Sequence, residues 1–313
     1  MTMTTVSPRP RIARRALDGV LLLDKPVGLS SNDALMRAKR LYLAKKAGHT
    51  GTLDPLASGL LPLCFGEATK FSQDLLDADK TYEATMRLGV RTATGDAEGE
   101  VLETRDVRCA PADVEAVLAR FVGDIVQVPP MYSALKRDGK PLYEYARAGQ
   151  TVEREGRAVS IRALDMLSCT LPDVTFRVTC SKGTYVRTLA EDLGGALGCG
   201  GHLTMLRRTA VGALTLEHAV TLDALANATQ HERDAWLQPV DALLSTFPRV
   251  KLDAALAERF VHGQRLPLAE LAARPDIGDG ARVRVYDGDD RLLGVARAAH
   301  GVLAPQRLVV TGE

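Results

Sequence analysis

One window, residues 48–62 (GHTGTLDPLASGLLP), limits what this chain can fold into more than any other part of it. Its glycine and proline residues interrupt any helix or regular strand, so the pattern predicts a loop. The only carboxylate in the window, Asp54, lies between Leu53 and Pro55. Alone, an aspartate before proline is more typical of an ordinary turn. The surrounding hydroxyls, and glycines that let a ligand approach closely, favour a reactive group instead.

The rest of the first 240 residues mixes patterns of strands and helices. Apolar runs and two-residue alternation predict strands at 19–25, 81–90 and 176–180. Helical spacing predicts helices from a cap at Asn32 to about Ala44, from Pro111 through Phe121, and through Leu189, Leu193 and Leu197. Because strands and helices follow one another irregularly, we expect an α+β fold rather than a doubly wound parallel sheet.

Residues 250–313 are predicted to form a second, small unit. A helical segment over 252–261 precedes strand-like stretches at 283–287, 294–300 and 307–310. The turn GDD (288–290) suits a hairpin between the first two of them. A segment of this length suffices for a small β-rich domain. At the other end, residues 1–18 are polar and basic and contain Pro8 and Pro10, so we expect a disordered tail.

Charge and cysteine usage narrow the class of protein. Residues 25–50 hold six bases and one acid, although the whole chain has a net charge of only +1. That local excess fits a polyanionic partner or a solvated helix face equally well. The five cysteines form no CxxC pair, which argues against a zinc site or a disulfide framework and favours a reducing, cytoplasmic location. No apolar run approaches the ~20 residues of a membrane-spanning helix.

Four blocks of the sequence, in one order, resemble the TruB family of tRNA pseudouridine synthases. They are GHTGTLDP (48–55), DKTYEA (79–84), CSKGTYVRTLAEDLG (180–194) and LTMLRRTAVG (203–212). The stretch 128–147 resembles a further family block, a supporting wall with an RNA-contacting insertion. The resemblance implies a catalytic domain over 19–240, with a mixed, largely antiparallel sheet, flanking helices and a central RNA-binding cleft. Residues 250–313 resemble a PUA-type RNA-binding domain, although 251–313 carries nine bases and nine acids and is neutral.

The activity implied by this resemblance is an isomerisation. The family converts uridine-55 in the TΨC loop of tRNA to pseudouridine, breaking the N1–C1′ bond, turning the base and rejoining it through C5. No metal or cofactor is implied. Because a stacked base is out of reach, the target nucleotide has to be flipped out of the RNA. We therefore expect tRNA as the partner of a monomeric chain that needs no obligate protein partner and no membrane.

The resemblance also implies roles for two charged residues. Asp54 matches the catalytic carboxylate, assigned as the nucleophile, and Arg187 matches its basic partner. A permanent cation beside a partly buried carboxylate favours the ionised form. If the segment around Tyr185 is a strand, Tyr185 and Arg187 share one of its faces. Read without the resemblance, Arg187 fits a surface charge at the start of a helix.

Four more residues are implied to hold the substrate. Their roles are base flipping for His49, stacking on the flipped base for Tyr82, nucleotide contact for Tyr185 and apolar contact with the base for Leu206. Stacking of a base on an aromatic ring contributes about 1–3 kcal/mol, which offsets much of the cost of unstacking. Without the resemblance, His49 is more typical of a hydrogen-bonded structural residue, and Tyr82 and Leu206 are more typical of core residues. Open alternatives remain for four basic residues: Arg207 and Arg208 could meet phosphates, and Lys25 and Lys70 fit structural or RNA-facing positions.

Three other functions compete with this interpretation. A guide-RNA-dependent synthase of the dyskerin type is the nearest, but that class carries a larger PUA region and flanking extensions. A non-catalytic RNA-binding or RNA-folding protein has no need of Asp54. A glycoside hydrolase needs two carboxylates in paired roles, whereas the motif loop offers one.

Overall fold

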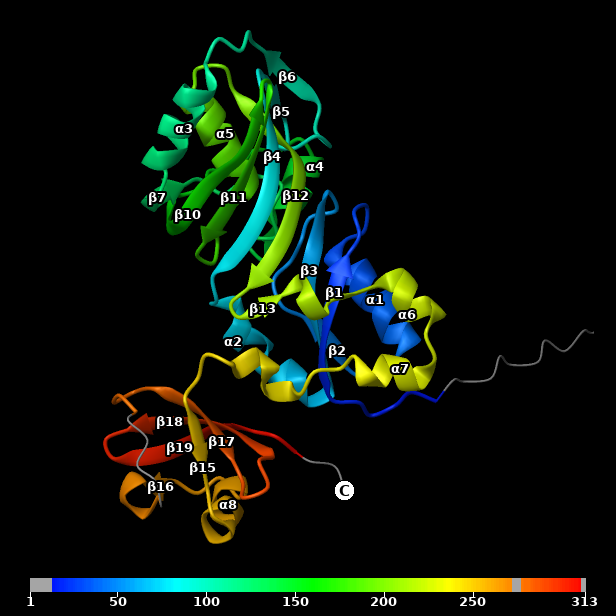
Figure 1. Ribbon diagram of the computed structural model, residues 1–313, viewed down its shortest axis with the longest axis vertical. Coiled ribbons are helices and arrows are strands. Elements are labelled where there is room, and N and C mark those ends of the chain that lie inside the picture. The colour runs from blue at the N-terminus through cyan, green and yellow to red at the C-terminus, as the bar shows by residue number, and fades with distance from the viewer. Residues whose placement is uncertain (1–12, 272–276, 311–313) are drawn as a thin grey trace, which may run out of the picture.

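The largest element of the computed structural model, which describes residues 13–271 and 277–310, is a mixed sheet of ten strands (Figure 1). In order across the sheet they are β14 (Val220–Thr221), β1 (Gly19–Lys25), β3 (Ala57–Phe65), β12 (Gly201–Val211), β4 (Lys80–Leu88), β11 (Asp173–Cys180), β10 (Arg157–Thr170) and β7 (Gly123–Gln127), with β2 (Ala47–His49) beside β3 and β13 (Leu214–Thr215) beside β12. Only the pairs β1–β14 and β3–β12 are parallel. The predicted α+β fold with a largely antiparallel sheet is therefore confirmed.

The loop predicted for the whole 48–62 window is limited to residues 50–56, because β2 includes 48–49 and β3 begins at Ala57. Two hydrophobic clusters lie on opposite faces of the strands beside this loop. In β1, Leu21 and Leu23 point into the cluster that packs against the long helices, whereas Val20 and Leu22 point into the other. Burial on both faces explains why this strand is a continuous apolar run rather than an alternating one. The position of β3 beside β1 and β12 fixes the loop before it at the middle of the sheet.

Helices cover the sheet where the sequence shows helical spacing. The α-helices of this part are α1 (Ser31–Leu41), α2 (Ser72–Leu76), α3 (Pro111–Arg120), α4 (Leu142–Arg147), α5 (Val186–Ala196), α6 (Leu222–Asn227) and α7 (Gln230–Ala235). Short 3-10 turns are η1 (Gly66–Phe71), η2 (Leu216–His218) and η3 (Val240–Leu244), and small hairpins are formed by β5 (Val90–Thr92) with β6 (Val101–Thr104) and β8 (Lys136–Arg137) with β9 (Lys140–Pro141). In Figure 1, α3 and α5 lie together over one end of the sheet, and α1, α6 and α7 gather at the other.

The predicted cap of α1 at Asn32 is wrong. Ser30 caps this helix by accepting a hydrogen bond from the Asp33 amide at 3.1 Å, and the helix ends at Leu41. Serine and asparagine cap comparably well, so sequence alone did not separate the two positions. The apolar stripe of the helix is as predicted, because Leu35, Ala38 and Tyr42 are all buried.

The C-terminal unit has a five-stranded sheet and a core of its own. The strand order is β15 (Arg249–Lys251), β17 (Arg282–Tyr286), β18 (Leu292–Ala299), β19 (Val302–Leu308) and β16 (Leu266–Pro267), with α8 (Ala254–Val261) and the turn η4 (Leu268–Glu270) beside them. β17 and β18 form the predicted hairpin. The third predicted strand is longer than expected, because β19 begins at Val302 rather than at residue 307.

This unit is docked on the 3-10 turn and short helix that follow β3. The Lys70 ammonium donates to the Leu308 carbonyl at 3.0 Å and pairs with Glu67 at 2.6 Å. Arg282 forms an ion pair with Asp74, whose side chain is almost fully buried. Of the two positions left open for Lys70, structural or RNA-facing, these contacts favour the structural one.

The prediction of a disordered tail over residues 1–18 is wrong for residues 13–18. Residues 1–12 lie outside the described part of the chain. Residues 13–18 pack on the body, where the Arg15 guanidinium pairs with the Asp234 carboxylate at 2.6 Å and the Arg15 amide donates to the Leu43 carbonyl at 2.7 Å. This contact corrects the predicted boundary at residue 18.

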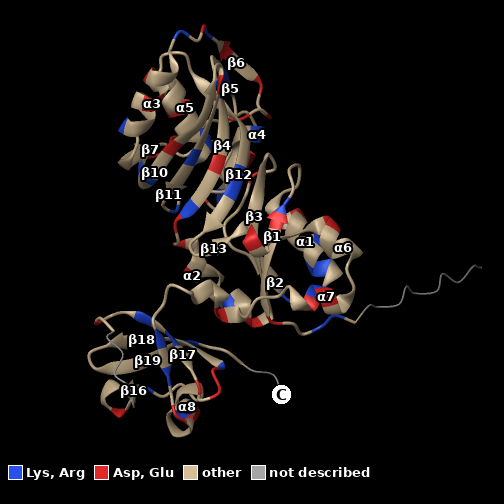
Figure 2. Ribbon diagram, in the orientation of Figure 1, with Lys and Arg blue, Asp and Glu red and all other residues tan. Residues whose placement is uncertain are grey.

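Charges of both signs lie side by side along the strands at the middle of the sheet (Figure 2). Arg87 of β4 stands opposite Asp173 of β11, and Arg177 of β11 stands opposite Glu83 of β4. The basic window is different: Arg37 and Arg40 on α1, with Lys45 and Lys46 after it, are exposed, and the described residues provide none of the four with an ion-pair partner. A polyanion can therefore reach these four cations.

Candidate active site

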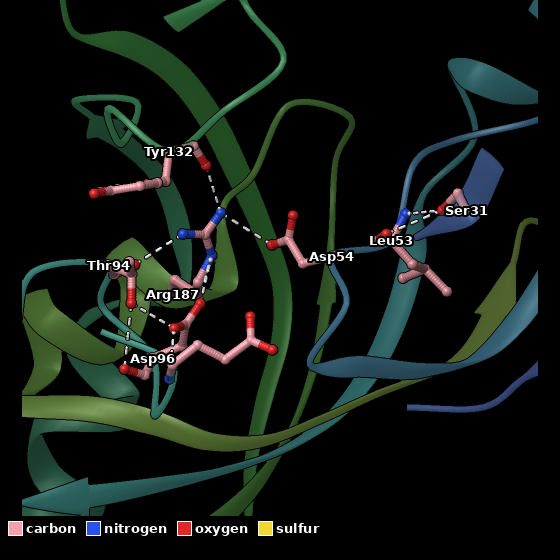
Figure 3. A network of polar contacts seen from close by, with 8 residues as sticks. Ser31, Leu53, Asp54, Thr94, Asp96, Tyr132 and Arg187 are labelled. Carbon is pink, nitrogen blue, oxygen red and sulfur yellow. Dashed lines mark hydrogen bonds and ion pairs between the residues drawn. The ribbon is translucent and has the colours of Figure 1, made fainter. Parts of the chain in front are cut away.

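Asp54 stands on the loop between β2 and β3, and its carboxylate is held by Arg187 (Figure 3). The Arg187 Nη2 atom lies 3.0 Å from Asp54 Oδ2. The two side chains differ in exposure: 41% of the Asp54 side chain is accessible, against 5% of the Arg187 side chain. A buried cation therefore presents a carboxylate that remains open to a substrate.

Arg187 itself is fixed by a set of buried acceptors. Its guanidinium donates to the Thr94 carbonyl at 2.8 Å and to the Tyr132 carbonyl at 2.7 Å, and its Nε lies 3.5 Å from Asp96 Oδ2. These contacts occupy the planar fork of the guanidinium in several directions at once (Figure 3). Arg187 is thus orientated before any substrate arrives.

Asp96 is the residue that reasoning from the sequence missed. It lies in the loop RTATGDAEG, where it reads as an ordinary turn aspartate, yet only 3% of it is exposed. Thr94 Oγ1 donates to its carboxylate, and the Glu98 amide donates to it at 3.1 Å. A buried carboxylate needs such partners, and together with Arg187 and Asp54 it forms a chain of alternating charge.

We expect Asp96→Asn to reduce turnover by about tenfold and stability by ~1–3 kcal/mol, because Arg187 then loses one buried acceptor and faces an amide that can donate. Rates with saturating substrate and urea unfolding measure the two effects. Asp106→Asn is the matched control, since Asp106 pairs with Arg108 in a highly exposed ion pair. An Asp96→Asn enzyme with the control's rate and stability would contradict this role.

The carboxylate faces a pocket of about 350 Å³. Five of the six predicted site residues line it, namely Asp54, Tyr82, Tyr185, Arg187 and Leu206. The wall is completed by residues from the end of α2, by Ser133 to Leu135, by the loop 181–184 and by Arg208. Because β12 lies between β3 and β4, the strand pairing places Leu206 beside Ala57 and Ala84, which brings the loop and Tyr82 to one pocket.

Comparison with known proteins agrees with this arrangement. Residues 39–186 match the model of the TruB family pseudouridylate synthase N-terminal domain, residues 187–245 match the tRNA pseudouridylate synthase B C-terminal domain, and residues 248–309 match the pseudouridine synthase II TruB C-terminal domain. The chain is 86% identical to tRNA pseudouridine synthase B of Burkholderia mallei over 310 residues, covering 99% of this chain and 100% of the relative.

The chain belongs to the TruB family. A more distant relative, tRNA pseudouridine synthase B of Ralstonia pickettii, is 65% identical and covers 96% of this chain and 98% of its own. Among solved structures, the archaeal box H/ACA sRNP Nop10-Cbf5 complex matches with a TM-score of 0.72 and 26% identity, over 93% of this chain and 85% of that chain. The H/ACA RNP bound to a substrate RNA containing 2′-deoxyuridine matches equally, with a TM-score of 0.72 and 26% identity, over 94% and 85% of the two chains.

Tyr185 and Arg187 do not lie on a strand in this TruB-family chain, which corrects the argument that they share a strand face. Tyr185 precedes α5, and Arg187 lies in its first turn. Both nevertheless line the pocket, because this end of the helix points into it. Burial, the largest influence, raises the pKa of Tyr185, so its hydroxyl is protonated at neutral pH.

Arg208 does not meet phosphates from the surface, as the sequence had allowed. Only 1% of it is exposed, and its guanidinium donates to the Leu60 carbonyl at 2.7 Å and to the Gly51 carbonyl at 3.0 Å. Its neighbour Arg207 is paired with Asp24 at 2.7 Å. Arg208 therefore ties the start of the catalytic loop to β3, and Gly59 is required beside it because a Cβ there would come within 2.2 Å of the Arg208 carbonyl oxygen.

His49 is the one predicted site residue that is not on the pocket wall. It pairs with Leu63 at the end of β2, and its buried Nδ1 has no hydrogen-bond partner within the described residues. Burial and the nearby Arg208 charge lower the pKa of the imidazole, which keeps the ring neutral at pH 7. A neutral ring is suited to stacking, but its role in base flipping stays a prediction.

Tyr82 and Lys80 enter the pocket from β4. Burial raises the pKa of Tyr82, so the ring presents a protonated hydroxyl. The Lys80 ammonium donates to the Leu76 carbonyl at 2.6 Å and to the Ala78 carbonyl at 2.5 Å, and burial lowers its pKa to about 8. Lys80 thereby fixes the end of α2 against the start of the strand that carries Tyr82.

Neither a metal site nor a membrane-spanning helix is found among the described residues. Over 13–271 and 277–310, no group of three or more His, Cys, Asp or Glu side chains is placed to hold a metal ion. In the same residues, no helix is both long and apolar enough to cross a membrane.

Proposed function

We propose that this TruB-family chain, a tRNA pseudouridine synthase by its family and relatives, isomerises uridine-55 in the TΨC loop of tRNA without a guide RNA. The observation that carries the proposal is the Asp54–Arg187 pair, in which a buried cation holds an accessible carboxylate at the pocket. The relatives at 86% and 65% identity bear the name tRNA pseudouridine synthase B. The chains from the two H/ACA complexes are only 26% identical, so a stand-alone enzyme is favoured over the dyskerin type.

In this mechanism the pocket residues divide the work. The flipped uridine stacks on Tyr82, Leu206 contacts the base, and Tyr185 contacts the nucleotide. Asp54, held in place by Arg187, attacks C1′, so that a bond from its oxygen to C1′ forms as the N1–C1′ bond breaks and the uracil leaves as an anion. After the base turns, C5 bonds to C1′ as the bond to Asp54 breaks, and C5 then loses its proton while N1 takes one up. The 350 Å³ volume and apolar wall suit one unstacked nucleotide.

A paired-carboxylate mechanism of the glycosidase kind has no support in this geometry. Two further carboxylates lie near Asp54, Asp96 and Glu98, and neither lines the pocket. Asp96 is also only 3% exposed and bound to Arg187. Paired hydrolytic carboxylates flank the bond that they cleave and both reach the substrate. Of these three carboxylates, only Asp54 lines the pocket.

The division of labour along the chain is part of the proposal. Residues 19–240 carry the catalytic domain and 250–313 a PUA-like RNA-binding domain, while the chain acts as a monomer in the cytoplasm with no obligate protein partner. Strands β17 and β19 dock on the segment 66–76, and Leu76 at the end of that segment lines the pocket. This arrangement supports binding of one tRNA by both domains.

The direct test uses the purified protein and an unmodified tRNA transcript, with no guide RNA. Mapping pseudouridine at single-nucleotide resolution should show one new pseudouridine, at position 55. A transcript with cytidine at that position is the control and should show none. Product at another position would contradict the assignment of the target, and no product despite tight binding would contradict a stand-alone enzyme.

We also expect affinity for a TΨC stem-loop to fall steeply with salt, because contacts with phosphates release counterions. Charge reversal of the exposed pair Lys45 and Lys46 should weaken binding at low salt and reduce the salt slope by about one unit per lost contact. Arg108→Glu is the control, on a different face. Affinity that does not vary with salt would exclude the basic window around α1 as an RNA contact.

A further inference from the structure

The hydroxyl of Ser31 holds both peptide groups of the residue that precedes the catalytic carboxylate. Ser31 is the first residue of α1, lies 22 positions before Leu53 in the sequence, and is only 2% exposed. Its Oγ accepts from the Leu53 amide at 2.7 Å and donates to the Leu53 carbonyl at 3.0 Å (Figure 3). A hydroxyl serves both purposes because it donates once and accepts twice.

The opposite side of Asp54 is held by the same N-terminal segment. The Gly28 amide donates to the Pro55 carbonyl at 2.8 Å. The turn that carries Gly28 is fixed in its own right, because the fully buried Lys25 ammonium donates to the carbonyls of Pro26 at 2.8 Å and Leu29 at 2.7 Å. Ser31 and Gly28 therefore hold the backbone immediately before and after Asp54.

Asp54 has few contacts of its own that could replace this grip. Its carbonyl accepts from the Ala57 amide at 3.1 Å, and its carboxylate, 41% exposed, has Arg187 as its ion-pair partner. Leu53, by contrast, is 3% exposed and packs in the core. The position of the carboxylate thus depends on where the neighbouring peptide groups are anchored.

We propose that Ser31 is a positioning residue of the isomerisation, acting through Leu53 to hold the Asp54 carboxylate at Arg187 and in line with the bound nucleotide. The proposal rests on the function proposed above. Small displacements of a reacting group cost large factors in rate, and about 1 Å can cost 10²-fold. Ser31 does not line the pocket, so its loss acts on the chemical step and leaves binding of tRNA in place.

Ser31→Ala and Ser30→Ala form a matched pair of variants. Ser30 is the adjacent serine and caps α1 through the Asp33 amide, and among the described residues its side chain makes no hydrogen bond with the catalytic loop. In steady-state assays with tRNA, we expect Ser31→Ala to lower kcat by about 10- to 100-fold with KM within about twofold, and the Kd for tRNA should also stay within about twofold. Ser30→Ala should keep the wild-type kcat, and Ser31→Thr, which restores a hydroxyl, should recover most of the rate.

Amide hydrogen exchange provides a second measurement. Exchange in the segment 50–57 should be faster in Ser31→Ala than in the wild type, while the rest of the sheet stays protected. If the alanine variant does not fold, Ser31→Cys, with a thiol that bonds weakly, is measured in its place. An unchanged kcat in Ser31→Ala, or an equal loss of kcat in Ser30→Ala, would overturn the role of Ser31. In either case, activity of the wild-type protein would leave the proposed function intact. A wild-type protein that forms no pseudouridine in tRNA would instead overturn the function and this role together.

Discussion

Asp54→Asn is expected to lower pseudouridine formation by at least about 10⁴-fold, the scale of loss when a reacting group is removed. The amide has nearly the same shape but lacks the negative charge and the nucleophilic oxygen. Binding of tRNA should change by less than about twofold, because Asp54 supplies one accessible side chain in a large interface. Single-turnover rates and a filter-binding affinity on the same tRNA measure the two effects.

A matched control exists on the outer face of the sheet. Asp173 forms an ion pair with Arg87 at 2.8 Å and has a side-chain exposure of 38%, close to the 41% of Asp54. Asp173→Asn therefore removes the same charge from a similar ion pair far along the chain, and the wild-type rate should persist. Measurable multiple turnover by Asp54→Asn would show that this carboxylate is not the reacting group.

Arg187→Met is expected to damage both the chemistry and the fold. Removing this cation leaves the buried Asp96 carboxylate without its ion-pair partner and frees the carbonyls of Thr94 and Tyr132. Breaking a buried ion pair from one side costs about 3–5 kcal/mol. Turnover should fall at least 10²-fold, because Asp54 loses the group that orientates it. Urea unfolding and single-turnover rates are the measurements.

The double variant Arg187→Met, Asp96→Asn separates the two effects. Neutralising Asp96 removes the unpaired buried charge, so part of the lost stability should return, whereas activity should not. Arg87→Met, on the exposed face, is the control and should cost no more than about 1 kcal/mol. Wild-type stability in Arg187→Met would contradict the view that this arginine compensates a buried carboxylate.

Local patterns predicted the four longest α-helices, α1, α3, α5 and α8, and the buried strand β1, but not the shorter helices or the buried strands β3 and β12. The run from Gly19 to Lys25, the proline at the start of α3 and the leucine spacing of α5 each depend on short-range periodicity, and each element is where it was predicted. The long strand β10 was not predicted. Much of its C-terminal half is exposed, so apolar and polar residues do not alternate regularly along it. Periodicity reports burial, and a strand buried along only part of its length lacks that signal.

Site residues that lie within a short sequence motif could be predicted, whereas residues whose role depends on tertiary structure were missed. Asp54 and Tyr82 lie in the blocks from which the family resemblance was drawn, whereas Asp96 lies in a loop between those blocks, where it looks like an ordinary turn aspartate. For Arg208 the prediction failed in the opposite sense. The sequence suggested that Arg207 and Arg208 both lie at the surface, but the strand directs Arg207 towards Asp24 and buries Arg208 under the pocket. Which of two adjacent arginines is buried depends on strand register, which composition does not report.

The parallel pairing of β3 with β12 has a consequence for the protein while it is still being made. Arg208 bonds to the Leu60 carbonyl 148 positions earlier and to the Gly51 carbonyl 157 positions earlier. At ribosomal rates of about 5–20 residues per second, roughly 7–30 s separate the synthesis of the catalytic loop from that of its anchor. A nascent chain therefore carries Asp54 for several seconds before β12 can complete the pocket, and we expect modification of RNA to begin only after β12 has left the ribosome.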